Sequence, residues 1–215
     1  MFVEKWMTPD PVTIPPTTTI SAAALLMARH KFRHLLITEA SGSGKKLLGL
    51  LSKYDIARAS PNDFNPFSPE VTEASLPRPV WSIMTRNVIT VPPNCAIEEA
   101  ARILRSQQIN ALPVVRGDNL AGIITESNIF EALIDMTGAN TAGAKMVLES
   151  DDVEKALAYV IQLTEHHNLS IQNVMSYRDP RSADKVILVF RFPDRPNSDF
   201  VQKLCRHGFR LLSLL

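Results

Sequence analysis

Two short segments of this 215-residue chain place a hydroxyl side chain three residues before a carboxylate or an amide. Ser52 precedes Asp55 and Thr125 precedes Asn128, each where an apolar run passes into a helical pattern. The first turn of a helix offers free N–H groups and a partial positive charge to a phosphate. A hydroxyl there can donate to a phosphate oxygen, and a carboxylate one turn on can accept both hydroxyls of a ribose. The spacing therefore indicates a nucleotide site in each segment.

The same spacing also has a purely structural explanation. Ser and Thr are common helix N-caps, and Asp55 or Asn128 three residues later can complete a capping box without any ligand. A cap and a ligand site can coexist, so both interpretations stay open.

The two segments differ in charge. Asp55 is a carboxylate, whereas Asn128 is an amide. Hydrogen bonds to an ionised acceptor are about twice as strong as neutral ones, so we expect the Asp55 site to hold a ribose better. Leu36 also stands where the second copy has Pro113, which predicts different base pockets.

An internal repeat relates the two segments. With an offset of 77, Met7–Thr8 matches Met84–Thr85 and Val12–Pro16 matches Ile89–Pro93. An insertion at 40–45 lengthens the first copy, and beyond it the offset is 73, so that Gly49–Ser52 matches Gly122–Thr125. A dozen similar positions at a constant offset identify a duplication.

Each copy predicts the element order β-α-β-β-α. In the first copy a Thr-rich strand leads to a helix over Ile20–His30 with Thr18 or Thr19 as N-cap. Strands follow at His34–Thr38 and Leu47–Leu51, joined by a Gly-Ser turn, and a second helix runs from Ser52 toward Ser60. A unit of about 55 residues is small for an independent core, so we expect the two copies to pack face to face and bury both sheets.

The predicted domains are residues 1–60, a Pro-rich linker at 61–80, residues 81–137, and a different unit at 143–215. This last unit predicts six elements in the order β-α-β-β-α-β, the ferredoxin-like order. They are a strand at 144–149, a helix at 151–167, strands at 170–177 and 185–192 around a turn at 179–182, a helix at 198–207 ending at Gly208, and a strand at 209–214. The fold class is therefore α/β (α+β).

The duplicated unit resembles the cystathionine-β-synthase (CBS) domain, and the pair resembles a Bateman module. The segments that carry the resemblance are Met7–Thr8, Met84–Thr85, Arg33–Leu35, Ala111–Val115, Gly49–Asp55 and Gly122–Asn128. The C-terminal unit is similar to the ACT domain in element order and in the strand Ile171–Val174, although Lys155 stands near the position where that family usually has Gly. The whole order is similar to acetoin-utilisation proteins.

The resemblance implies a regulatory adenine nucleotide (AMP, ADP or ATP), or another adenosyl ligand, in the clefts between the CBS units. It places these residues at the ligand: Thr13, Arg33, His34, Ser52, Asp55, Thr90, Asn110, Ala111, Pro113, Thr125 and Asn128. Arg33, His34, Lys53 and Arg116 are the candidate phosphate partners, although such residues are more often just solvated surface charges. Plain β-propensity explains Thr13 and Thr90 as well as a ligand does.

Composition excludes several classes of partner. Lys plus Arg is 23 and Asp plus Glu is 22, so a strongly basic nucleic-acid binder is not expected. Two distant cysteines, Cys95 and Cys205, indicate a reducing compartment, and no apolar run is long enough to span a membrane. We therefore expect a cytoplasmic protein. His166–His167 lacks a third metal ligand at short spacing, so no metal is expected.

These observations favour a non-catalytic regulatory protein that binds an adenosyl ligand and passes its state to an unidentified protein or to its own ACT-like unit. The resemblance also implies a homodimer. Two alternatives remain: an enzyme or subunit acting in acetoin catabolism, and a dimerisation module that binds no ligand. No catalytic cofactor is expected, because no nucleophile–base pair or phosphate-binding loop is visible in the sequence.

Overall fold

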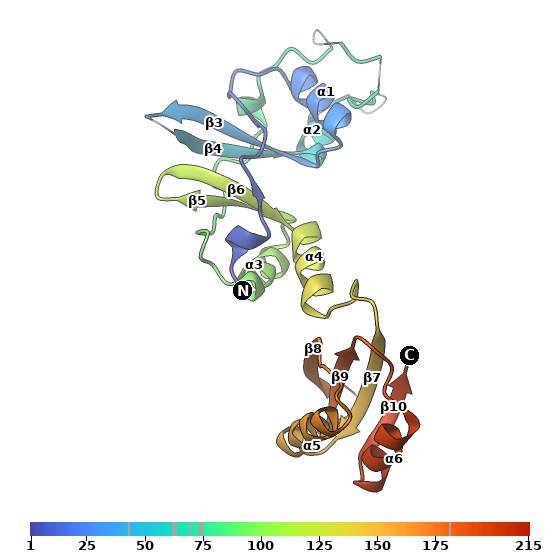
Figure 1. Cartoon of the computed structure of the whole chain (residues 1–215). Helices are drawn as coiled ribbons and strands as arrows, with labels where there is room; N and C mark the ends of the chain where they lie inside the picture. Colours follow the sequence, from blue (N-terminus) through green and yellow to red (C-terminus); the bar gives the residue numbers. More distant parts are fainter. Residues whose placement is uncertain (43, 62–63, 69, 73–74, 181) are drawn as a thin grey trace. The chain divides into compact units, whose positions relative to one another are not determined.

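The computed structural model describes residues 1–42, 44–61, 64–68, 70–72, 75–180 and 182–215, with Ala183 described by its backbone alone. The chain forms two compact units, Met1–Glu131 and Ala132–Leu215 (Figure 1). Parts of the predicted insertion, the Pro-rich linker and the turn at 179–182 lie outside the described residues, namely 43, 62–63, 69, 73–74 and 181.

The first copy confirms the predicted helix. Helix α1 (Ile20–His30) begins where Thr19 Oγ1 accepts a hydrogen bond from the Ala22 N–H at 3.2 Å, and its buried face includes Ile20 and Met27. Strands β3 (His34–Ser41) and β4 (Gly44–Ser52) are longer than predicted, because the insertion continues their pairing to Ser41 and Gly44. Helix α2 (Lys53–Ala59) follows.

The second copy repeats these elements. It contains α3 (Ile97–Gln107), β5 (Ala111–Arg116), β6 (Asn119–Thr125) and α4 (Glu126–Met136). Ala96 stands where the first copy has Thr19, so α3 has no side-chain cap. Glu98 and Glu99 in its first turn still complement the helix dipole.

One sheet contains both hairpins. Its order is β1-β6-β4-β3-β2, with β5 also paired to β6; β1 is Thr8–Pro9 and β2 is Thr13–Ile14. The predicted leading strand is thus only two residues long. Leu36, Ala111 and Ile123 form a buried cluster, against which Leu47, Leu50 and Leu120 pack. The two copies therefore share an apolar contact, but their strands join in one sheet rather than forming the two separate sheets expected to pack face to face.

The segment that precedes each copy hydrogen-bonds to the other copy. The Val3 N–H donates to Cys95 O and the Ile97 N–H to Met1 O, both at 2.9 Å. In the related position, the Val80 N–H donates to Thr18 O at 2.8 Å. The short 3-10 helices Val3–Lys5 and Val80–Ser82 lie in these segments. The residues that precede each copy in sequence thus pack on the other copy. The predicted domain ranges 1–60 and 81–137 do not show this exchange, because they follow the order of the sequence.

The second compact unit confirms the order β-α-β-β-α-β. Its four-stranded antiparallel sheet has the order β10-β7-β9-β8. Gly208 follows the last helix with a φ of +89°, as expected of a residue just after a helix C-cap. The elements are β7 (Ala144–Ser150), α5 (Val153–His166), β8 (Asn173–Asp179), β9 (Ser182–Phe192), α6 (Ser198–Arg206) and β10 (Arg210–Leu214).

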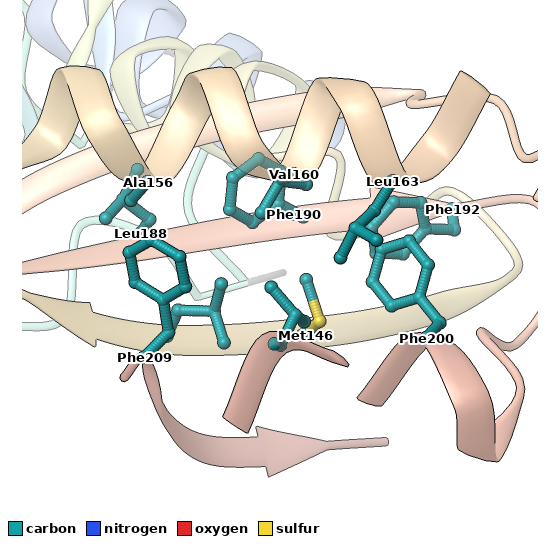
Figure 2. Packing of buried hydrophobic residues seen from close by; sticks show 11 residues of the cluster. Met146, Ala156, Val160, Leu163, Leu188, Phe190, Phe192, Phe200 and Phe209 are labelled. Carbon is teal, nitrogen blue, oxygen red and sulfur yellow. The ribbon is translucent and has the colours of Figure 1, made fainter. Parts of the chain in front are cut away.

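The core of this unit lies between its helices and one face of its sheet. Figure 2 shows Val160 and Leu163 of α5 facing Phe190 and Phe192 of β9, with Phe200 of α6 beside them. All five are buried, at 5% exposure or less. The helical spacing on α5 and the alternation on β9 bring these side chains to one layer.

Candidate functional site

The Ser52–Asp55 pair forms the capping box that its spacing predicts. Asp55 Oδ2 accepts from the Ser52 N–H at 2.8 Å and from Ser52 Oγ at 2.6 Å. Ser52 Oγ in turn accepts from the Asp55 N–H at 3.2 Å. These bonds fix the carboxylate against the first turn of α2 while occupying one of its two oxygens. The structural interpretation of the motif is therefore correct for this copy.

The Thr125–Asn128 pair makes a similar turn with a different chemical outcome. Asn128 Oδ1 accepts from the Thr125 N–H at 2.9 Å and from Thr125 Oγ1 at 2.8 Å. Because a backbone N–H can only donate, the amide oxygen must face Thr125 and the amide nitrogen must face away.

The two pairs thus present opposite groups. Among the described residues no hydrogen bond reaches Oδ1 of Asp55, which can accept from a ligand hydroxyl. The corresponding atom of Asn128 is Nδ2, which can only donate.

A cleft of about 580 Å³, here called the Ser52 cleft, lies in front of the Asp55 pair. Apolar side chains such as Val88, Ile89 and Ile109 line it together with polar groups at the start of α2. Its full lining is Arg33, His34, Leu50, Ser52, Lys53, Tyr54, Asp55, Thr85, Asn87, Val88, Ile89, Gln108, Ile109, Asn110 and Ala111.

A second cleft of about 300 Å³, here called the Thr125 cleft, is built from the equivalent parts of the other copy. Thr8 corresponds to Thr85, and Lys31–His34 corresponds to Gln108–Ala111. Its lining is Thr8, Asp10, Pro11, Val12, Lys31, Phe32, Arg33, His34, Leu36, Ile123 and Thr125. The duplication in sequence therefore appears as two related clefts, each with walls from both copies.

Two glycines allow the Met–Thr segments to form these walls. A Cβ on Gly49 would lie 2.7 Å from Met84 Sδ and 2.8 Å from Thr85 O. A Cβ on Gly122 would lie 2.6 Å from Met7 Sδ and 2.9 Å from Thr8 O. Backbone hydrogen bonds between Leu50 and Thr85, 2.9 Å in both directions, hold the first contact. The repeated Gly and the repeated Met–Thr are thus two sides of one close contact.

Most of the predicted site residues meet in the clefts. Arg33, His34, Ser52, Asp55, Asn110 and Ala111 line the Ser52 cleft, and Thr125 lines the other. Asn128 reaches its cleft through the bond to Thr125. Pro113 is buried in β5, outside both linings.

Thr13, Thr90 and Arg116 also lie outside both linings. Thr13 instead lines a separate hollow with Thr38 and Lys45. Residues that sequence reasoning did not assign to a site take their place at the walls: Thr8, Asp10, Lys31, Thr85, Asn87 and Gln108. The recurrence of Met–Thr was the signal that could have identified Thr8 and Thr85.

Arg33 and His34 are the titratable side chains that line both clefts. Burial and the neighbouring Arg33 guanidinium lower the pKa of His34, and the Asp55 carboxylate raises it by a smaller amount. The net shift is downward, so His34 is mainly neutral near pH 7. Lys53, which lines the Ser52 cleft with Arg33, has its Nζ 5.1 Å from the centre of the Phe67 ring.

Neither a metal cluster nor a membrane-spanning helix is present in the described part of the chain. No group of three or more His, Cys, Asp or Glu side chains there could hold a metal. His167, one of the two adjacent histidines, has its Nδ1 3.4 Å from Asn197 Nδ2. No helix among those described is long and apolar enough to cross a membrane.

The family profile of the CBS domain matches residues 3–62 and 80–135, which are the two copies of the repeat. The chain belongs to the CBS domain family. Its first compact unit is a CBS pair, or Bateman module, with the α/β fold of that family. The match ends before β7, so the ACT assignment of the C-terminal unit stays a prediction.

Curated relatives of the CBS pair are longer than this chain. The uncharacterized protein MJ1225 of Methanocaldococcus jannaschii is 31% identical over 135 residues, covering 60% of this chain and 48% of MJ1225. The homoserine O-acetyltransferase of Methanocorpusculum labreanum is 32% identical over 130 residues, covering 60% of this chain and 23% of the enzyme. The chain thus spans half or less of the length of these relatives.

Solved structures of CBS pairs superpose on the first unit. A candidate acetoin utilization protein, AcuB from Vibrio cholerae, is 30% identical with a TM-score of 0.55, covering 66% of this chain and 98% of AcuB. CBSX2, solved in complex with AMP, is 27% identical with a TM-score of 0.52, covering 62% and 96%. The pair of MJ0100, solved with 5′-methylthioadenosine and S-adenosyl-L-methionine, is 26% identical with a TM-score of 0.51, covering 66% and 98%. CBS pairs similar to this one therefore bind adenosyl ligands.

Proposed function

We propose that this CBS pair is a sensor that binds an adenine nucleotide in the Ser52 cleft. One observation carries the proposal: Asp55 is fixed by its capping box with one carboxylate oxygen still able to accept, at the edge of a cleft of about 580 Å³. A cleft of this volume lies within the range of small-ligand sites.

Each part of an adenosine nucleotide has a matching group in the Ser52 cleft. The ribose hydroxyls would donate to Asp55 Oδ1, and the base would pack on Val88, Ile89 and Ile109. The phosphate would lie near Arg33, which supplies a guanidinium suited to bidentate phosphate binding.

The output of the sensor is proposed to be regulatory. The C-terminal unit has the element order of an ACT domain, and we propose that it receives the state of the CBS pair or passes it to an unidentified protein. The similarity to AcuB favours a role in acetoin or central carbon metabolism. Pairing of two copies through the CBS pair and the ACT-like sheet would make the functional form a homodimer.

Calorimetry and thermal shift with a panel of nucleotides test the proposal. AMP, ADP or ATP should raise the melting temperature, and GMP should raise it less, since a ligand that binds only the folded state stabilises by RT ln(1 + [L]/Kd). Asp55→Ala serves as the matched control and should weaken the shift. The absence of heat with any adenosyl ligand at millimolar concentration would exclude a sensor and favour a ligand-free dimerisation module. Turnover of acetoin by the same sample would favour the enzyme alternative.

A further inference from the structure

Two adjacent residues belong to both clefts. Arg33 and His34 line the Ser52 cleft and the Thr125 cleft alike. They lie at the start of β3, where His34 pairs in register with Ser52. The two clefts therefore draw on the same pair of side chains.

The bonds of Arg33 show how it serves both sides. Its carbonyl accepts from the Lys53 N–H at 3.0 Å, at the start of α2 in the Ser52 cleft. Its guanidinium reaches the other copy, where Nη2 donates to Ser127 Oγ at 2.9 Å. Ser127 lies between Thr125 and Asn128. In the absence of ligand, the backbone of Arg33 is thus anchored at one cleft and its charge is placed at the other.

The second copy supplies no equivalent cations. Asn110 and Ala111 occupy the positions of Arg33 and His34, and both are uncharged. The counterpart of Lys53 is Glu126, which is acidic. The Thr125 cleft has Lys31 as its other cation, but Asp10 lines it as well. Arg33 is therefore the one guanidinium in the two linings, beside Lys53 in the Ser52 cleft and Lys31 in the Thr125 cleft.

Building on the proposed function, we propose that the two clefts are coupled through Arg33, so that the CBS pair accepts one phosphorylated ligand strongly and a second one weakly. A nucleotide phosphate in the Ser52 cleft draws the guanidinium away from Ser127. The Thr125 cleft then keeps the Ser127 hydroxyl and the Asn128 amide, which are neutral, beside Asp10. Its preferred ligand becomes an uncharged adenosine compound.

The test is a sequential titration of the full chain. The protein is saturated with AMP at one equivalent and then titrated with either AMP or adenosine. We expect adenosine to bind the AMP-loaded protein at least about tenfold more tightly than a second AMP, a factor that corresponds to about 1.4 kcal/mol.

Two variants separate the shared guanidinium from other causes. Asn110→Arg gives the Ser52 cleft its own guanidinium and should strengthen the second AMP by about tenfold, because Arg33 then stays at Ser127. Arg33→Gln keeps a hydrogen-bonding side chain without the charge, so the first AMP should weaken, and the AMP-loaded variant should bind a second AMP and adenosine with similar affinity.

The possible outcomes are distinct. Equal affinity of the AMP-loaded protein for AMP and adenosine, or no second ligand of either kind, would overturn the coupling and leave nucleotide sensing intact. In AMP-loaded Arg33→Gln, a second AMP that still binds about tenfold more weakly than adenosine would also overturn it. A failure of the proposed function is different, because neither AMP nor adenosine would then bind at all.

Discussion

The two halves of the CBS pair agree where they build the clefts and differ where they would meet a ligand. Gly49 and Gly122 each receive a Met–Thr segment from the other copy at nearly the same distances. Asp55 and Asn128, by contrast, present an acceptor and a donor at the same place. Duplication has thus kept the residues that shape the clefts and changed residues that the proposed function places at the ligand.

The close Gly contact is the same in both halves, so equivalent substitutions should destabilise both halves equally. Gly49→Ala and Gly122→Ala should each lower the free energy of unfolding by about 3 kcal/mol, at the upper end for overpacking, because the new Cβ meets a backbone oxygen as well as Met sulfur. Chemical denaturation of both variants measures this loss. Gly117→Ala is the control, since a Cβ there meets nothing within 4 Å and only the cost of its φ of +59° remains. A large effect in one half alone would break the structural equivalence.

The difference between Asp55 and Asn128 predicts unequal effects on nucleotide binding. Asp55→Ala should cost about 1.5–3 kcal/mol of AMP binding, because a charge-assisted hydrogen bond is lost. Asn128→Ala should cost about 0.5–1.5 kcal/mol, since the lost interaction is neutral. Titration calorimetry of the two variants gives both values, and the comparison fails if Asn128→Ala loses more affinity.

A pair of exchanges sharpens the same test. Asp55→Asn should bring the Ser52 cleft to the weaker level, and Asn128→Asp should strengthen ribose binding in the Thr125 cleft. Each exchange keeps the side-chain volume and one oxygen that accepts from the N–H of Ser52 or Thr125, so the start of the helix is preserved. Only the other terminal atom of the side chain changes, between oxygen and nitrogen.

How much of this site could be predicted depended on the range of the interactions involved. The Ser52–Asp55 turn is local, so three residues of sequence were enough to predict its hydrogen bonds. For the same reason the sequence limited the N-cap of α1 to Thr18 or Thr19, of which the structure has Thr19. The helix predicted at 151–167 and the strand predicted at 185–192 likewise correspond to α5 and β9.

The walls of the clefts could not be predicted in this way, because they come from the other copy. Thr85 reaches the Ser52 cleft through a contact with Gly49 that spans 36 residues of sequence. The resemblance placed Thr13 and Thr90 at the ligand, and these residues, which follow the Met–Thr segments, line neither cleft. The segments at Val3 and Val80 each contact the other copy, and this arrangement arises only when the two copies pack together.

His34, which lies beside Arg33 in both clefts, offers a further test of the difference between the halves. His34 has a lowered pKa, chiefly because of burial, so the folded state resists a proton that the unfolded chain takes up below about pH 6.5. Stability contributed by neutral His34 is present above that pH and declines as the pH falls toward its folded pKa. His34→Ala, which copies Ala111 of the other half, should show a smaller loss of melting temperature between pH 7 and pH 5. An unchanged pH dependence would show that other groups cause the acid sensitivity.

The smallest expected effect concerns the C-terminal unit, which has no counterpart in the repeat. Helix α4 begins directly after Thr125, and its last carbonyl, Met136 O, accepts from Asn173 Nδ2 at 2.7 Å on β8. Arg191 Nε donates to Thr137 O at 2.9 Å from β9, so the end of this helix is fixed to the second sheet. A ligand that alters the Thr125 turn would act on one end of a helix whose other end is held by these bonds, whereas α2 after Ser52 ends at Ala59. We therefore expect small changes in hydrogen exchange over residues 144–177 when the Thr125 cleft is filled, and none when only the Ser52 cleft is filled. Exchange that changes around both clefts while β7 and β8 stay unaltered at saturating ligand would show that the two units are uncoupled.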